Sequence, residues 1–114
     1  MDGINTHYTP ARELAAQLRD GSLSCSELMA ATLARIDACN PDLNAICTRV
    51  NDDQAMAMAA AMDETLRSGG APGPLAGLPM AVKDLSATAG MRTTMGSRIF
   101  AEHVPTEDSL LVQR

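Results

Sequence analysis

Lys83 is the residue of this sequence whose position most needs a chemical explanation. It follows an apolar run, Leu75 to Val82, that reads as a buried strand within the segment GPLAGLPMAVKDL. A buried ammonium group is costly unless it is paired or deprotonated. Two interpretations follow. Either Lys83 simply ends a strand, with its ammonium group reaching solvent beside Asp84, or its amine takes part in a reaction.

The remaining side chains that could act in catalysis or bind a metal form no recognisable pattern. Cys25, Cys39 and Cys47 have no C-x-x-C spacing, and neither His7 nor His103 lies near them in the sequence. This spacing argues against a zinc site and a disulfide framework, and it favours reduced thiols in a cytoplasmic protein. Neither a metal nor a cofactor is predicted.

The composition favours a core made of small side chains. Of 114 residues, 46% are apolar, with eight methionines, one phenylalanine, one tyrosine and no tryptophan, which suits close helix packing. A net charge of −5 without a Lys/Arg cluster argues against a nucleic-acid surface. No segment reaches the ~20 apolar residues that a membrane span needs. We expect a soluble protein of the cytoplasm.

Local signals predict two helices before residue 41. Thr9 is expected to cap the first helix and Gly21 to end it. Ser24 and Glu27 match a capping box for the second helix, which Asn40-Pro41 is expected to stop. An apolar stripe follows each of these start signals, as it does in helices that pack on a core.

Shorter elements are predicted after residue 41. AICTRV, Ala45 to Val50, alternates like a half-buried strand, and a helix is expected between Asn51 and a Gly69-Gly70 stop. The strand at 75–82 is expected to be distorted at Pro79, which lacks a ladder donor, or to be paired on one side only. A Gly/Ser/Thr-rich loop follows, and Thr106 can cap a last helix through EDSLLVQR.

Two strands are fewer than a typical sheet contains. We therefore expect an α/β chain that is a truncated and incomplete part of a larger protein. Residues 1–70 are predicted to form a helical region with one short strand, and residues 71–114 to begin the core of that larger fold.

A series of short motifs lies between residues 73 and 108. They are Gly73-Pro74-Leu75, Gly77-Leu78-Pro79, Lys83-Asp84, Gly90, Thr93-Thr94, Gly96-Ser97 and Glu107-Asp108. In this order they resemble the amidase signature family, and residues 10–68 are similar to its amino-terminal helices. The resemblance implies that the expected α/β fold is the mixed-sheet fold of that family, with the chain supplying its amino-terminal helices and first strands.

The resemblance also implies an amide hydrolase with a Ser-cisSer-Lys triad in which Lys83 is the lysine. A lysine held in a dry site loses affinity for its proton, so its neutral amine can act as general base on a serine hydroxyl. The serine would form an acyl-enzyme that water hydrolyses. No G-G-S-S-G run occurs in the sequence, so we expect both serines further along a longer chain and expect these 114 residues alone to be inactive.

Thr94, Gly96 and Ser97 are secondary candidates, for substrate binding. Gly/Ser/Thr clusters of this kind are by default turn residues. Loops on a rigid scaffold also carry binding sites. The pattern therefore leaves both a turn and a pocket-lining role open for these three residues.

Three functions remain compatible with these features. The first is an amidase that hydrolyses a small-molecule amide, with a homodimer permitted. The second is the amidase-like glutaminase subunit of a tRNA-dependent amidotransferase, which liberates ammonia from glutamine and depends on partner subunits. The third is a noncatalytic helical interaction module that keeps the motif as scaffold.

Overall fold

The computed structural model describes residues 6–114, which divide into two compact units. The helical unit contains the chain up to Ala45 together with Asn51–Pro79, and the signature unit contains Ile46–Val50 and Met80–Arg114. Residues 1–5, which the predicted helical region includes, lie outside the described residues. Within the described part of the chain, no helix is both long and apolar enough to cross a bilayer.

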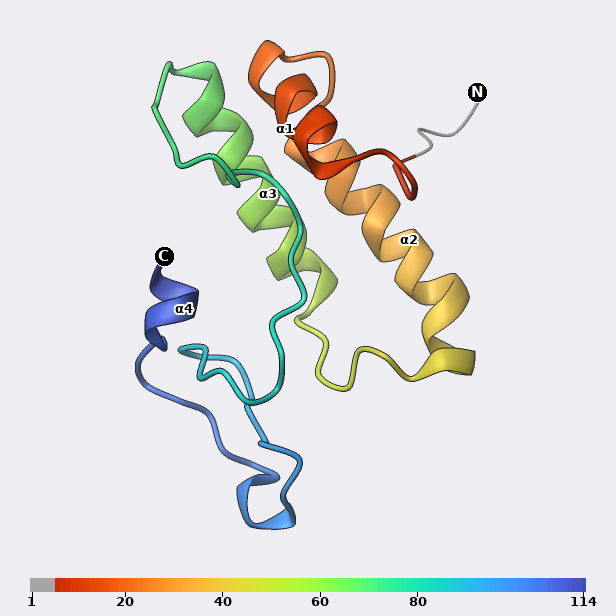
Figure 1. Cartoon of the computed structure of the whole chain (residues 1–114), viewed down its shortest axis with the longest axis vertical. Helices are drawn as coiled ribbons and strands as arrows, with labels where there is room; N and C mark the ends of the chain where they lie inside the picture. The colour runs from red at the N-terminus through yellow and green to blue at the C-terminus, as the bar shows by residue number, and fades with distance from the viewer. Residues whose placement is uncertain (1–5) are drawn as a thin grey trace. The chain divides into compact units, whose positions relative to one another are not determined.

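The described residues of the helical unit form three helices, α1 (Ala11–Asp20), α2 (Cys25–Leu43) and α3 (Asp52–Arg67). Helices α2 and α3 pack against each other and run in opposite directions (Figure 1). Helix α1 begins after Pro10 rather than directly after Thr9, and Gly21 ends it with a left-handed φ of 78°, as a helix-ending glycine requires.

The capping box of α2 is confirmed, whereas its predicted end is wrong. The Ser24 side chain accepts a hydrogen bond from the Glu27 N–H, and the Glu27 carboxylate accepts one from the Ser24 N–H. The helix continues through Pro41 to Leu43. Because Pro41 lies in the last turn, it removes a single terminal hydrogen bond, and the Asn44 N–H closes the end on the Asn40 carbonyl at 2.7 Å.

The predicted ends of α3 are also confirmed. The Asn51 side-chain oxygen accepts hydrogen bonds from the N–H groups of Asp53 and Gln54, at 2.8 and 3.4 Å. Gly69 follows the helix with a φ of 78°. Both ends of α3 therefore follow from residue chemistry within three positions of the helix.

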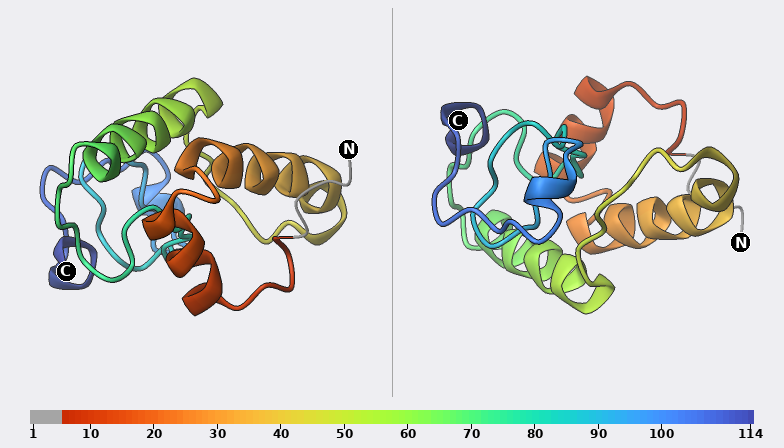
Figure 2. Two further views of the ribbon diagram at one scale, coloured as in Figure 1. Left: turned by 90° about the horizontal axis from the view of Figure 1, so that it is seen from above. Right: turned by 90° about the horizontal axis from the view of Figure 1, so that it is seen from below.

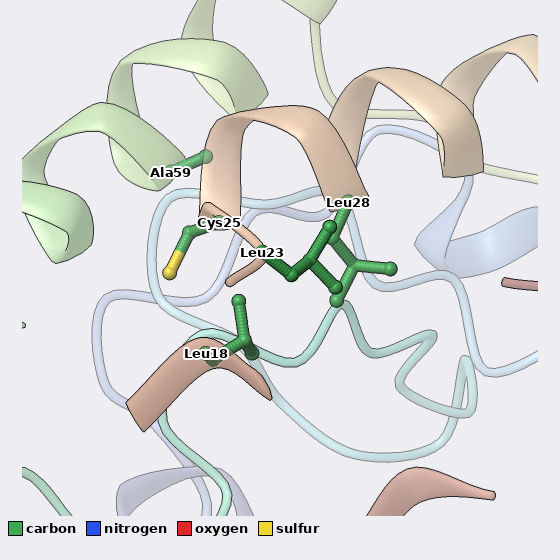
Figure 3. Close-up of a cluster of buried hydrophobic side chains, with 5 residues drawn as sticks. All are labelled: Leu18, Leu23, Cys25, Leu28 and Ala59. Carbon is green, nitrogen blue, oxygen red and sulfur yellow. The ribbon is translucent and has the colours of Figure 1, made fainter. Parts of the chain in front are cut away.

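Leucine dominates the core of the helical unit, and Cys25 and Ala59 are its small members, so the core contains larger side chains than the composition predicted. Figure 3 shows its central buried side chains, which are Leu18, Leu23, Cys25, Leu28 and Ala59. Cys25 is 1% exposed, and burial together with the neighbouring Asp63 carboxylate raises the pKa of its thiol to about 11.

Asp63 of α3 caps the amino terminus of α2 from across the interface. Its carboxylate accepts hydrogen bonds from the Cys25 N–H at 2.6 Å, the Ser26 N–H at 3.0 Å and the Ser26 hydroxyl at 2.6 Å. Burial alone would raise the pKa of Asp63, but the hydrogen bonds from Ser26 and Cys25 outweigh burial and lower it. A negative charge at this position also complements the positive end of the α2 dipole.

The prediction of β-strands is wrong for residues 6–114. In that range neither 45–50 nor 75–82 forms a strand, and the β-structure consists of one isolated bridge between Thr88 and Met91. Figure 2 shows the signature unit mostly as loop, interrupted by the 3₁₀ helix η1 (Arg98–Phe100) and by α4 (Leu110–Gln113). Helix α4 begins at Leu110 and not near Thr106.

The first part of the apolar segment folds into turns. The Ala76 N–H donates to the Gly73 carbonyl and the Leu78 N–H to the Leu75 carbonyl, at 3.1 and 3.2 Å. Gly77 has a φ of 82°, and a Cβ at this position would lie 2.6 Å from Cys25 Sγ. Only glycine allows this close approach, which anchors the segment on the helical core.

Candidate functional site

Lys83 lies at the start of a turn in the signature unit. Its carbonyl oxygen accepts a hydrogen bond from the Ser86 N–H at 2.9 Å, and its side chain is exposed. The preceding side chains are exposed as well, with Met80 69% and Val82 39% accessible. The residue is therefore presented on a turn and not at the end of a buried strand.

Asp84 contacts a loop ten residues further along the chain. The Thr94 N–H donates to its carboxylate at 2.7 Å, the Thr94 hydroxyl donates to the other carboxylate oxygen, and the Met95 N–H donates to its carbonyl at 2.9 Å. These hydrogen bonds from Thr94, together with the positive charge of Arg92, lower the pKa of Asp84. Asp84, which the sequence indicated only as a neighbour of Lys83, thus holds a loop through its side chain and its backbone.

Thr94, Gly96 and Ser97 belong to one tight turn. The Ser97 N–H donates to the Thr94 carbonyl at 3.0 Å, and the two central residues, Met95 and Gly96, have φ values of 53° and 66°. The Ser97 side chain then accepts a hydrogen bond from the Ile99 N–H at 3.2 Å and caps η1. The structure thus brings the three secondary candidates together and joins them through Asp84 to Lys83.

Backbone hydrogen bonds hold this turn within the signature unit. The Thr93 N–H donates to the His103 carbonyl at 2.9 Å, and the Gly90 N–H donates to the Pro105 carbonyl at 3.0 Å. The carboxylate of Asp108 accepts the Ala89 N–H at 2.7 Å. Asp108, expected in the first turn of a helix, instead joins two loop segments.

The described residues contain no group of three or more His, Cys, Asp or Glu side chains arranged to hold a metal ion. The three cysteines are free, with Cys25 buried and Cys47 exposed. Around the turn at 94–97, the side chains described above are the exposed amine of Lys83, the carboxylate of Asp84 and the hydroxyl groups of Thr94 and Ser97.

A family model described as Amidase matches residues 27–114, which include Lys83 and the whole turn at 94–97. The chain belongs to the amidase family. This finding confirms the resemblance seen in the motifs between residues 73 and 108.

Three relatives illustrate the range of the family. The chain is 37% identical over 111 residues to the A-subunit of glutamyl-tRNA(Gln) amidotransferase from Carboxydothermus hydrogenoformans, a match that covers 97% of the chain and 23% of that protein. The same subunit from Granulibacter bethesdensis is 48% identical over 103 residues, covering 87% of the chain and 20% of that protein. An acylamidase of Rhodococcus erythropolis is 36% identical over 114 residues, covering 100% of the chain and 24% of that protein. The chain thus spans about a quarter or less of the length of these relatives.

A solved structure shares the fold. It is described as an unexpected vestigial protein complex that reveals the evolutionary origins of an s-triazine catabolic enzyme. The similarity has a TM-score of 0.82 at 33% identity and covers 92% of this chain and 23% of that one. The chain therefore has the amidase fold over its matched residues, although it contributes helices and loops and no described strands.

Proposed function

We propose that this chain supplies the lysine of a Ser-cisSer-Lys amidase that hydrolyses small-molecule amides. The observation that carries the proposal is the exposed Lys83, which is the only lysine of the sequence, beside the Asp84-bound turn inside the family match. The two triad serines would belong to polypeptide outside these 114 residues, and no cofactor takes part.

The reaction assigned to Lys83 is proton transfer. Its neutral amine takes the proton of a serine hydroxyl as the serine oxygen attacks the amide carbonyl carbon. The carbon–nitrogen bond then breaks, and the proton passes to the leaving nitrogen, which departs as ammonia or an amine. Water attacks the resulting ester, Lys83 takes the proton of the water and returns it to the serine, and a carboxylic acid leaves.

Substitution of Lys83 tests this role in the natural polypeptide that carries residues 1–114. We expect this protein to release ammonia from at least one of propionamide, benzamide and glutamine, and we expect Lys83→Ala to lower kcat by a factor on the order of 10³. The matched control is Arg67→Ala, which removes an exposed cation distant in sequence from Lys83 and should leave kcat unchanged. A Lys83→Ala protein with the parental kcat would sink the assignment.

A second candidate is the glutamine-hydrolysing subunit of a tRNA-dependent amidotransferase. The relatives from Carboxydothermus hydrogenoformans and Granulibacter bethesdensis, both named as part of glutamyl-tRNA(Gln) amidotransferase, favour it. This function requires partner subunits. It predicts a preference for glutamine over propionamide and benzamide and copurification of other subunits, whereas a stand-alone amidase predicts neither.

Three free cysteines support a reducing, cytoplasmic location as part of the proposal. A homodimer stays a prediction, which light scattering of the purified natural protein would test directly.

A further inference from the structure

The turn at residues 94–97 contains a residue that such turns normally avoid. Met95 and Gly96 have positive φ values of 53° and 66°, the combination typical of a type I′ turn. Glycine, asparagine and aspartate dominate these positions because other side chains are strained there. Strain of this kind persists where surrounding contacts determine the backbone, and it is concentrated at functional sites.

Asp84 provides the contacts that hold the strained turn. Its two carboxylate oxygens accept the N–H and the hydroxyl of Thr94, and its carbonyl oxygen accepts the Met95 N–H. The Thr94 hydroxyl oxygen in turn accepts the Gly96 N–H at 3.2 Å. Side chain and backbone of Asp84 thus bind the two residues that open the turn.

Lys83 immediately precedes Asp84, so its backbone is covalently joined to the residue that holds the turn. Its own carbonyl is held by the Ser86 N–H at 2.9 Å, while its side chain is exposed. The arrangement restrains the backbone from which the amine extends. The Asp84 carboxylate points to Thr94, where both of its oxygens accept hydrogen bonds from the turn.

We propose that Asp84 and Thr94 are positioning residues for Lys83, because their hydrogen bonds fix the Lys83 backbone against the 94–97 turn and so aim the amine. This inference rests on the proposed function of Lys83 as general base. A general base must lie within about 2.6–3.2 Å of the proton that it removes. A displacement of about 1 Å can lower a rate by about 10²-fold.

Kinetics of the natural polypeptide test the proposal, with ammonia release from propionamide, benzamide and glutamine as the readout. We expect Asp84→Asn to lower kcat by about 10–100-fold with KM changed less than about threefold. Thr94→Val removes the hydroxyl and keeps the N–H donor, so we expect a loss of about tenfold. Thr94→Ser restores the hydroxyl and should return kcat to within about threefold of the parent.

Glu102→Gln is the matched control. It neutralises another carboxylate of the same unit, on an exposed residue outside the 94–97 turn, and we expect kcat within about twofold of the parent. Amide hydrogen exchange adds a structural readout, because Asp84→Asn should speed exchange of the Thr94 and Met95 amides by at least about tenfold.

Each result decides between the two proposals. If Lys83→Ala abolishes activity while Asp84→Asn and Thr94→Val keep the parental kcat, the positioning role is wrong and the proposed function stands. If Lys83→Ala keeps its activity, the proposed base role fails and the inference fails with it. Should Asp84→Asn not fold, the Thr94→Val and Thr94→Ser pair decides alone, and equal kcat values in that pair would overturn the inference.

Discussion

Each unit is stabilised internally, and the kind of contact differs between the two units. In the helical unit, apolar side chains such as Leu18 and Leu28 are 3% and 2% exposed. Among Ile46–Val50 and Met80–Arg114, the buried residues are Thr93 and Pro105, whereas Ile99 is 88% exposed. Hydrogen bonds from backbone N–H groups to carbonyls and carboxylates connect that unit instead.

This difference indicates that one kind of contact stabilises the fold and the other fixes the conformation of a loop. Apolar burial is strong and non-directional, so it stabilises a fold without specifying one loop geometry. Hydrogen bonds contribute less net free energy each, but their distances and angles are restrictive. Apolar burial in the helical unit is therefore suited to stabilise its fold, and the hydrogen bonds of the signature unit are suited to hold a turn in one conformation.

The largest expected effect is the loss of a core side chain. Leu28→Ala should lower the free energy of unfolding by about 2–5 kcal/mol, because it leaves a cavity among buried neighbours. Ile99→Ala, the matched truncation on the exposed surface of the signature unit, should change it by less than about 0.5 kcal/mol. Urea denaturation followed by circular dichroism measures both values. Equal losses would contradict the comparison.

The anchoring of the Gly77 segment gives the next largest effect. Gly77→Ala should destabilise the helical unit by about 1–3 kcal/mol, because its φ is 82° and the new Cβ would approach Cys25 Sγ to 2.6 Å. Gly73→Ala is the control, since nothing lies within 4 Å of a Cβ there. Thermal unfolding of the two variants should give the lower midpoint for Gly77→Ala.

Loss of the Asp63 cap should have a smaller, pH-dependent effect. Asp63→Asn should cost about 1–2 kcal/mol at pH 7, because the neutral amide accepts fewer hydrogen bonds from Cys25 and Ser26. The pKa of Asp63 is lowered from 3.8. Its ionised form therefore stabilises the fold fully above about pH 3.8 and progressively less as the pH falls through the folded-state pKa.

Urea denaturation of the parent and of Asp63→Asn at several pH values measures this dependence. The difference in unfolding free energy between them should shrink as the pH falls below about 3.8 and stay constant between about pH 5 and 7. A difference that grows on acidification would show that Asp63 does not act as an ionised cap.

The smallest expected effect is a gain. Met95→Gly should relieve the left-handed strain at a φ of 53° and stabilise the signature unit by about 0.5–1 kcal/mol, after the greater chain entropy of glycine is offset. Amide exchange at the Met95 position should slow correspondingly. If Met95→Gly destabilised the protein, the prediction would be wrong, and the contacts of the methionine side chain would contribute more stability than the backbone strain removes.

The sequence predicted those features that depend on neighbouring residues. The caps at Ser24 and Asn51 and the helix-ending Gly21 and Gly69 were found because each acts within about four positions of a helix end. The motifs around Lys83 identified the family for the same reason, since they are read as a contiguous pattern. The catalytic role of Lys83 stays a prediction.

Only the tertiary structure decided which residues meet across the chain. The apolar run 75–82 looked like a strand, yet a strand forms only beside a partner, and in the structure Gly77 packs on Cys25 instead. The bonds of Asp63 to Cys25 span 38 positions and those of Asp84 to Thr94 span ten. No local pattern encodes such pairs, because a carboxylate finds its donors only after packing has placed them.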